Sequence, residues 1–519
     1  MKKITKKISF TLLLGYFPVL LFAQQSINHE HPNILIIFSD DHAYQATSAY
    51  GNKIILTPNI DRIAKEGALL INNFVTNSIC GPSRATLLTG KYSHLNGYKF
   101  NERKFDFNQQ VFPALLQQSG YQTAWIGKLH LGNLPYNGFN YFNVLPGQGV
   151  YYNPDFINYK NDTIRYPGYV TDIITDFSVD WLDKRDTSKP FFLVVGEKAT
   201  HREWLPSLED LGAYDSINFP LPETFYDNYD NRLAAKDQDM TIDKTMRLQQ
   251  DLKVHADYDK DDIYNRFTPE QRKVFADYYE NKISKEFDEK KLSGKELVRW
   301  KYERYLKDYY ATAKSLDRNI GKILDYLDKN GLEKNTVVIY ASDQGFYLGE
   351  HGWFDKRFMY EESLRSAFVI RYPGVIKPGT VVPQFVSNID WAPTLLDIAH
   401  AKIPAAIQGV SFLKLLNAKK SIAIPWRNEV YYHYYEFPEP HHVHPHFGIR
   451  TEKYKLIYFY EGMSWWELYD LTKDPHEIHN IYNKKGNEKI IAGLKTELKK
   501  LMIQYKDDEA LKMLEKINP

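Results

Sequence analysis

Short apolar runs alternate with longer helical patterns along most of the chain. Residues 33–38, Asn-Ile-Leu-Ile-Ile-Phe, form a continuous apolar run that is typical of a strand buried on both faces. Similar runs occur at Gln122–Ile126, Pro190–Gly196, Thr336–Ala341 and Ala367–Arg371. Strands that alternate with helices predict an α/β fold with a large, doubly wound and mostly parallel sheet.

The clearest helical pattern spans Tyr305–Leu327, where apolar side chains recur every three or four residues and Asn330-Gly331 supplies a stop. Before it, residues 205–304 are strongly charged and rich in Tyr, which predicts a helical surface insertion. This insertion either walls one side of a site or is a solvated face without a role. The sequence favours neither alternative.

The character of the chain changes again after Pro425. Val430–Tyr435, His446–Thr451 and Lys453–Tyr460 are typical of antiparallel strands, and an amphipathic helix is expected around Glu488–Tyr505. We therefore predict a main α/β domain over residues 24–425 and a smaller α+β subdomain over residues 426–519.

The first 23 residues have the pattern of an export signal. A lysine-rich start precedes an apolar run from Phe10 to Ala23, which is short for a membrane span and is interrupted by Gly15 and Pro18. We expect cleavage after Ala23 and a periplasmic or secreted protein. No cysteine follows the run, so lipid attachment there is excluded.

Charge and composition add little about partners. Without the four lysines of the predicted signal, 62 basic residues face 65 acidic ones, so the mature chain is close to neutral. No long basic stripe is present, and nothing indicates nucleic-acid binding. Length and a 43% hydrophobic content are sufficient for a large buried core. Oligomeric state is not indicated.

Charged and polar residues directly follow three of the predicted strands. They are Asp40-Asp41, Lys128 and Asp343-Gln344. Ligand sites of doubly wound sheets form beyond the carboxyl ends of the strands. An Asp-Asp pair alone more often caps a helix or is solvated, but two acidic sites after two strands favour a metal centre. Oxygen ligands select Ca²⁺ or Mg²⁺ rather than zinc.

Cys80 is the single cysteine of the chain, although an exported protein is able to use disulfides. A lone cysteine is most often a small buried hydrophobic residue. Here it begins the segment Cys-Gly-Pro-Ser-Arg-Ala-Thr-Leu-Leu-Thr-Gly over residues 80–90. This segment resembles the signature of the formylglycine-dependent sulfatases, in which cysteine, any residue, proline, serine and arginine precede a threonine-glycine. The resemblance extends from Pro32 to about Tyr482.

The resemblance implies an alkaline-phosphatase-like fold and a sulfuric ester hydrolase. It also implies that a maturation enzyme oxidises Cys80 to formylglycine (3-oxoalanine). A hydrated aldehyde carries two hydroxyls on one carbon. One attacks sulfur, and loss of the proton of the other then expels sulfate. By the same resemblance Ca²⁺ is held by Asp40, Asp41, Asp343, Gln344 and the modified Cys80.

Further residues match positions of the family. The resemblance assigns Lys128 and Lys356 to the sulfate oxygens, and Arg84 and His130 to the aldehyde hydrate. His201 is expected to protonate the departing sugar oxygen, a task suited to a group that titrates near neutral pH. The family often has proline before this histidine, whereas this chain has Thr200.

The substrate is a sulfated carbohydrate in this interpretation. The chain looks most like bacterial polysaccharide sulfatases and N-acetylglucosamine-6-sulfatases, and ulvan-type algal glycans and glycosaminoglycans are both substrates to consider. Two alternatives stay open, namely a phosphonate or phosphate ester hydrolase of the same superfamily and a non-catalytic protein that binds sulfated glycans. The candidate sugar contacts are His94, Asn96, Arg202, Trp204, His444 and His446. The histidine run that contains the last two is equally interpreted as a loop with incidental metal affinity.

Overall fold

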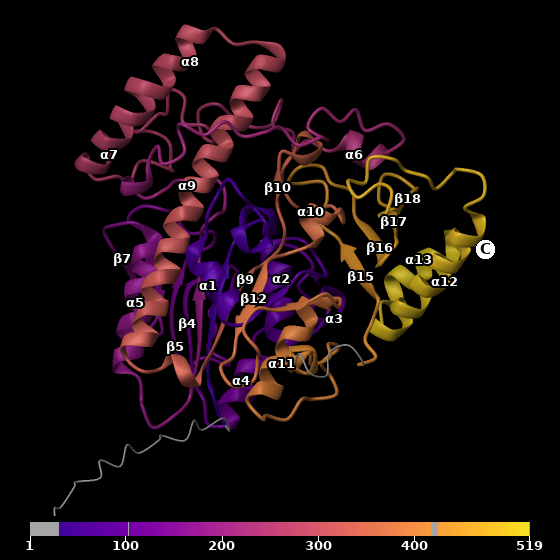
Figure 1. The fold of residues 1–519 in the computed structure, drawn as a ribbon, viewed down its shortest axis with the longest axis horizontal. Coiled ribbons are helices and arrows are strands. Elements are labelled where there is room, and N and C mark those ends of the chain that lie inside the picture. The colour runs from indigo at the N-terminus through magenta and orange to yellow at the C-terminus, as the bar shows by residue number, and fades with distance from the viewer. Residues whose placement is uncertain (1–30, 102, 417–423, 518–519) are drawn as a thin grey trace, which may run out of the picture.

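A ten-stranded sheet forms the centre of the molecule in the computed structural model, which describes residues 31–101, 103–416 and 424–517 (Figure 1). The strand order is β13-β2-β12-β9-β1-β8-β4-β5-β6-β7. In that order the strands are Thr380–Val382, Ala68–Leu70, Phe368–Arg371, Thr336–Ser342, Asn33–Ser39, Phe191–Gly196, Gln122–Lys128, Tyr141–Leu145, Asp155–Asn158 and Thr163–Arg165.

The central strands are parallel and buried on both faces, as the sequence predicts. β1 pairs in parallel with both β8 and β9, and β4 pairs in parallel with β8 and β5. The alignment of Phe38 with both Gly196 and Ala341 brings the carboxyl ends of β1, β8 and β9 to one edge. β12 differs from its neighbours because it runs antiparallel to β9 and β2.

Helices cover both faces of this sheet (Figure 1). On one face lie α1 (Pro58–Glu66), α5 (Val170–Lys184) and α9 (Gly294–Lys329). On the other lie α2 (Cys80–Thr89), α4 (Phe112–Gln118) and α11 (Trp391–Ile398). The doubly wound α/β fold predicted from the alternating pattern is therefore confirmed.

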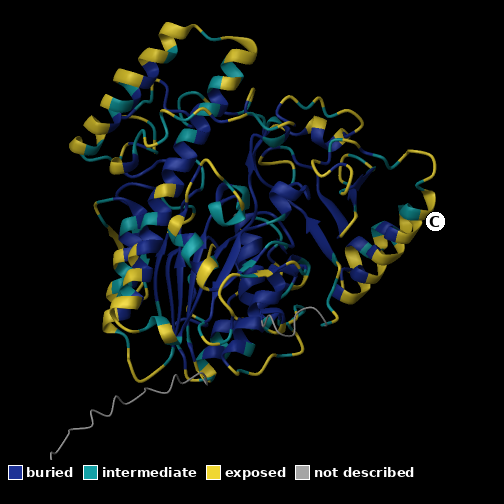
Figure 2. Cartoon of the chain, in the orientation of Figure 1, coloured by how far each residue is buried: buried dark blue, intermediate teal, exposed yellow. Residues whose placement is uncertain are grey.

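The charged insertion is less helical than the sequence indicates. Between residues 205 and 268 its only α-helix is α6 (Leu233–Asp237), and α7 (Pro269–Phe275), a π-helical stretch (Ala276–Ser284) and α8 (Lys285–Lys290) follow. The aspartates explain the difference, because their side chains accept backbone N–H bonds two residues on, as Asp227 does from Tyr229. The outer sides of α7 and α8 are exposed (Figure 2).

A separate antiparallel sheet follows near the C-terminus. β15 (Glu429–Tyr434), β16 (His446–Thr451), β17 (Tyr454–Phe459) and β18 (Trp465–Asp470) pair in chain order, and α12 (Glu488–Tyr505) and α13 (Asp508–Ile517) pack on them. The strand β18 and the helix α13 were not predicted. The division at residue 425 stays a prediction. The remaining short elements are β3 (Asn73–Phe74), β10 (Tyr347–Leu348), β11 (Phe354–Asp355), β14 (Val386–Ser387), α3 (Ser93–Asn96) and α10 (Glu361–Leu364).

Two further sequence predictions concern membranes and export. Within the residues described, no helix has the length and apolar character that crossing a membrane requires. The export signal predicted at residues 1–23 lies outside the described residues.

The close approach of β4 and β8 depends on Gly196. A Cβ at this position would lie 2.4 Å from the carbonyl oxygen of Lys128 and 3.0 Å from Nε1 of Trp125. We expect Gly196→Ala to lower the free energy of unfolding by about 1–3 kcal/mol, because backbone must shift to relieve the overlap. Gly493→Ala in α12 is the control, since a Cβ there meets nothing within 4 Å. It should be neutral or stabilising by about 0.5–1 kcal/mol. Thermal denaturation measures both, and equal melting temperatures would contradict the packing argument.

Candidate active site

Three carboxylates meet where β1 and β9 end. Asp40 and Asp41 directly follow β1, Asp343 directly follows β9, and all three are at most 1% exposed. The backbone N–H of Asp41 donates to Oδ1 of Asp343 at 3.1 Å. Carboxylate oxygens of the three residues lie within 4.8 Å of one another. Parallel pairing of the two strands therefore brings together residues that are 300 positions apart in the chain.

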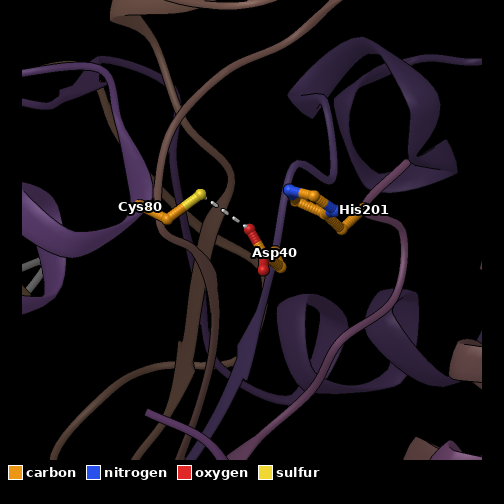
Figure 3. Close-up of side chains that lie close together, drawn as sticks. All are labelled: Asp40, Cys80 and His201. Atoms are coloured by element: carbon orange, nitrogen blue, oxygen red, sulfur yellow. Dashed lines mark hydrogen bonds between the residues drawn. The ribbon is translucent and has the colours of Figure 1, made fainter. Parts of the chain in front are cut away.

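Cys80 is the first residue of α2 and is fully buried beside these carboxylates. Its Sγ donates to Oδ1 of Asp40 at 3.2 Å, and Nε2 of Gln344 lies 3.7 Å from Sγ. Figure 3 shows Asp40 between Cys80 and His201. Burial raises the pKa of the Cys80 thiol well above its usual range, and the charges of Asp343 and Asp41 raise it further against the opposing effect of Lys356. Burial therefore disfavours the thiolate, which is the nucleophilic form of a cysteine.

Arg84 lies one helical turn after Cys80 and points the same way. Its Nε and Nη2 donate to Oδ2 of Asp343 at 3.2 and 3.1 Å, and its Nη1 donates to the Lys128 carbonyl at 2.9 Å. The guanidinium is fully buried, and its two donors share one oxygen of Asp343, so Arg84 compensates the buried negative charge of that carboxylate.

Two buried lysines complete the charge balance. Lys128, the last residue of β4, forms an ion pair with Asp40. Lys356, directly after β11, donates from Nζ to Oδ2 of Asp41 at 2.8 Å. Burial lowers the pKa of Lys128, whereas the pKa of Lys356 is raised because the charges of Asp355 and Asp41 outweigh its burial. The structure thus brings both predicted lysines to the carboxylates.

His201 lies in the loop after β8, with Nε2 3.8 Å from Oδ2 of Asp41. Its Nδ1 lies 2.7 Å from the Arg202 carbonyl. A carbonyl only accepts, so Nδ1 carries a proton and Nε2 faces the carboxylates. Burial, followed by the charges of Lys128 and Lys198, lowers the pKa of His201 well below its usual range. Thr200 is accommodated here because its hydroxyl donates to the Asp41 carbonyl at 3.0 Å.

His130 follows the same strand as Lys128 and is 7% exposed. Burial and the nearby charges of Lys128 and Arg84 lower the pKa of its ring well below the usual range, which favours neutral imidazole. The positions predicted for catalysis therefore gather at one edge of the sheet.

The oxygen atoms of this centre suit a hard divalent cation. Besides the three carboxylates, Oε1 of Gln344 is buried without a hydrogen-bond partner. Burial raises the pKa of Asp41 to about 6, with Lys356 opposing this effect and Asp343 adding to it. A divalent ion would relieve the repulsion between the acids and engage the orphaned amide oxygen. A set of four oxygen-bearing side chains fits Ca²⁺.

A cavity of about 730 Å³ opens over this centre. His201 and Lys356 contribute to its wall, so the cavity reaches the buried charges. Arg202 also lines it, and its guanidinium is held by Asp251 at 2.8 and 2.7 Å. The other lining residues are Phe100, Asn101, Arg103, Gln148, Asp355, Arg357, Tyr435, Glu436, Phe437, Glu439, Pro440, His441 and Glu461.

The structure gives two of the predicted sugar contacts roles in packing near α3. Nε2 of His94 lies 2.8 Å from the Tyr505 carbonyl, and the His94 ring stacks on Tyr92. Asn96 donates to the Lys91 carbonyl at 3.0 Å. Neither residue lines the cavity, although Nδ1 of His94 lies 3.4 Å from the hydroxyl of Tyr435, which does.

Three further candidates also lie outside the cavity lining. Trp204 is fully buried against Tyr305, at 4.5 Å between ring centroids. His446 is fully buried and accepts from the Met359 N–H at 3.1 Å. His444 contacts Asp237 at 2.7 Å. The apolar and backbone partners of Trp204 and His446 account for their burial without a sugar.

Sequence reasoning missed a polar network in the cavity wall. Arg357 contacts Glu436 at 2.6 Å and Asp355 at 3.3 Å, and Asp355 contacts Nε2 of His441 at 3.3 Å. Asp355 and Arg357 have φ values of 83° and 94°, in a region that side chains rarely adopt. Such backbone strain often marks a functional segment. The only sequence signal was their position beside Lys356.

Comparison with known proteins identifies the family to which this protein belongs. The sulfatase family model matches residues 32–401, and the model of the C-terminal region of N-sulphoglucosamine sulphohydrolase matches residues 349–504. The chain belongs to the sulfatase family and is a sulfuric ester hydrolase.

Individual relatives narrow the comparison. The chain is 44% identical to an N-acetylglucosamine-6-O-sulfatase of Bacteroides thetaiotaomicron, over 92% of this chain and 88% of that protein. It is 25% identical to an ulvan-active sulfatase of Formosa agariphila, over 96% and 86% of the two chains. A solved structure in complex with its substrate, D-glucosamine-2-N,6-O-disulfate, matches with a TM-score of 0.89 and 44% identity, covering 92% of this chain and 98% of that one. A phosphonate monoester hydrolase of Agrobacterium radiobacter shares the fold at 19% identity and a TM-score of 0.68, covering 91% and 96%.

The oxygen-rich centre predicts stabilisation by calcium. We expect Ca²⁺ added to chelator-treated protein to raise the melting temperature, because an ion that binds only the folded state stabilises it. In Asp343→Ala this rise should disappear, whereas the exposed Glu515→Gln should keep it in full. Differential scanning calorimetry measures the shift. A rise of the same size in Asp343→Ala would place the calcium effect elsewhere.

Proposed function

We propose that the protein removes the 6-O-sulfate from a glucosamine or N-acetylglucosamine residue of a sulfated glycan. The 44% identity to a protein named for this activity supports the proposal. The same identity to a protein solved with a 6-O-sulfated glucosamine as its substrate points to the same sugar. The cavity over the charged centre has a volume typical of small-molecule sites.

The nucleophile in this proposal is formylglycine, formed from Cys80 by a maturation enzyme. Its hydrated aldehyde supplies a hydroxyl that attacks sulfur and a second hydroxyl that allows release of sulfate. The segment that begins at Cys80, together with the match of the chain to the sulfatase family, supports a modified residue over a thiol. Arg84, held by Asp343, lies one turn away and is suited to orient oxygen atoms on residue 80 together with His130.

Asp40, Asp41, Asp343 and Gln344 would hold Ca²⁺, which supplies positive charge to the nucleophile and to a sulfate oxygen. The surrounding residues then act on the substrate. Lys128 and Lys356 bind the remaining sulfate oxygens. Both amines are buried, so their contacts with an anion are strong.

His201 is the proposed acid for the departing sugar oxygen. Its Nδ1 proton is committed to the Arg202 carbonyl, which leaves Nε2 to carry the transferred proton. Burial is the largest cause of the low pKa of His201, and the charges of the neighbouring lysines add to it. Binding of an anionic sulfate offsets the contribution of the lysines. This change favours the protonated ring when substrate is present.

The wall of the cavity is proposed to select the sugar. Asp355, Arg357 and Glu436 offer acceptors and donors for hydroxyl groups, and Arg202 offers a fixed cation. The aromatic rings of Tyr435 and Phe437 line the same cavity and are suited to pack on a sugar ring. Export to the periplasm or the medium by the predicted signal at residues 1–23 completes the proposal.

The function is tested by sulfate release from defined sugars. Protein co-expressed with a maturation enzyme should hydrolyse D-glucosamine-2-N,6-O-disulfate with a kcat/KM at least about 100-fold above that for a 4-O-sulfated hexosamine. Cys80→Ala should lower kcat more than about 1,000-fold, because the nucleophile is lost. Ion chromatography of released sulfate measures both.

The same assay includes the competing activities. Faster turnover of an aryl phosphonate than of the 6-O-sulfated sugar would contradict the proposal that a sulfated sugar is the substrate. An active protein whose residue-80 peptide has the mass of unmodified cysteine would contradict the proposed nucleophile.

The role of His201 predicts a dependence on the leaving group. His201→Ala should lower kcat for the sugar sulfate by about 100-fold or more. The sugar oxygen is a poor leaving group unless an acid protonates it as the bond to sulfur breaks. The decrease in kcat for 4-nitrophenyl sulfate should be much smaller, since nitrophenolate leaves without help from an acid. Lys356→Ala is the control, because it removes a proposed contact to the sulfate group, which both substrates share, and should lower the turnover of both by similar factors. Equal losses for His201→Ala on both substrates would exclude the acid role.

A further inference from the structure

A second group of ligand-type side chains lies at the rim of the cavity, away from the carboxylates that follow β1 and β9. Asp237 ends α6, and His442 and His444 belong to the loop before β16. The two segments lie side by side, since the backbone N–H of Asp239 donates to the His441 carbonyl at 3.0 Å. In Figure 1, α6 is seen beside the C-terminal sheet.

Three potential ligand atoms converge in this group. Nε2 of His444 lies 2.7 Å, and Nε2 of His442 lies 3.5 Å, from the same oxygen, Oδ2 of Asp237. One potential ligand atom from each of the three residues lies within 4.8 Å of the other two. Ligand atoms of a tetrahedral zinc ion are about 3.3 Å apart, given bonds of about 2.0–2.1 Å. The Asp237 side chain is 53% exposed, so it is free to make the small adjustment that such bonds need.

The hydrogen bonds of His444 require a proton or a cation between its Nε2 and the carboxylate of Asp237. Its Nδ1 lies 2.7 Å from the Glu461 carbonyl, which only accepts, so Nδ1 carries a proton. In the neutral ring Nε2 is then a bare lone pair that faces a carboxylate oxygen. The contact is attractive only with a second proton or a cation between the two atoms. An imidazole that donates Nδ1–H to a carbonyl and presents Nε2 to an ion is the usual arrangement of a metal-binding histidine.

We propose that Asp237, His442 and His444 form a Zn²⁺ site at the rim of the substrate cavity. Two imidazole nitrogens and one carboxylate favour zinc, whereas the oxygen ligands after β1 and β9 favour calcium. His442 is 43% exposed, so water reaches the fourth coordination position. Zinc entry displaces any proton between His444 and Asp237, so binding releases that proton to solvent.

The ion would tie the insertion to the C-terminal subdomain. Phe437, which lines the cavity, packs on both imidazoles, with ring centroids 4.9 Å from His442 and 4.6 Å from His444. Glu461, which accepts from His444, also lines the cavity. Zinc at this place would therefore hold the insertion against the C-terminal segments that carry Phe437 and Glu461. This inference does not depend on the sugar proposed above.

Zinc binding to the full chain tests the site. The protein is used as Cys80→Ala, to remove a competing thiol, and is stripped with chelator and saturated with Ca²⁺ so that the oxygen ligands are occupied. Titration calorimetry with ZnCl₂ alone should show one bound ion per chain. Asp237→Ala and His444→Ala, each added separately, should weaken binding at least about tenfold. His400→Ala, which removes an exposed histidine elsewhere, should leave it unchanged.

A second measurement locates the ion. Anomalous diffraction at the zinc edge should place one peak between His442 and His444. Zinc affinity unchanged by Asp237→Ala and His444→Ala would overturn the proposal, as would a peak only at Asp40 and Asp343. Because Asp237 is half exposed, its replacement is expected to leave the fold intact, and an unchanged melting temperature in the absence of zinc verifies this.

Discussion

The arrangement of the candidate active site depends on charge compensation among buried side chains. Asp40, Asp41 and Asp343 are buried where β1 and β9 end, and Arg84, Lys128 and Lys356 are buried against them. Removing one partner of a buried ion pair costs about 3–5 kcal/mol, because the remaining charge is left unsolvated. Apart from the adjacent Asp40 and Asp41, these side chains come from separate segments of the chain. The strands, α2 and the segment after β11 must therefore be docked together for any of these charges to be tolerated.

This balance also prepares the centre for an anion. Three carboxylates and three cations cancel formally, so a divalent ion would leave the site with net positive charge, to which buried Lys198 adds. A sulfate ester is negatively charged and is attracted to such a site, most strongly where water is excluded. His201 lies within the same field, and its proton affinity therefore responds to whether the anion is present.

The sequence predicted those parts of the fold and of the candidate site that are encoded by neighbouring residues. It did not predict contacts between distant segments. The strands were predicted because Ile34–Phe38 and its counterparts are continuously apolar. The candidate catalytic residues were proposed because a short motif contains Cys80 and Arg84. The start of α9 at Gly294 was missed, because residues 294–304 were assigned to the charged insertion, although Val298 and Tyr302 continue the apolar face of the helix. The pairing of Asp355 with Arg357 and His441 joins segments about 85 residues apart, and no local pattern reports it.

The choice of sugar must therefore reside in the wall rather than in the charged centre. A phosphonate hydrolase with the same fold shows that the architecture alone does not fix the substrate. In the proposed mechanism the carboxylates and lysines would act only on the part of a substrate that every sulfate ester shares. Discrimination between sugars must come from groups that meet ring hydroxyls, and Asp355, Arg357 and Glu436 are nearly buried and mutually paired. A sugar that fails to match them leaves buried polar groups unsatisfied, which costs more than a lost contact on an exposed surface.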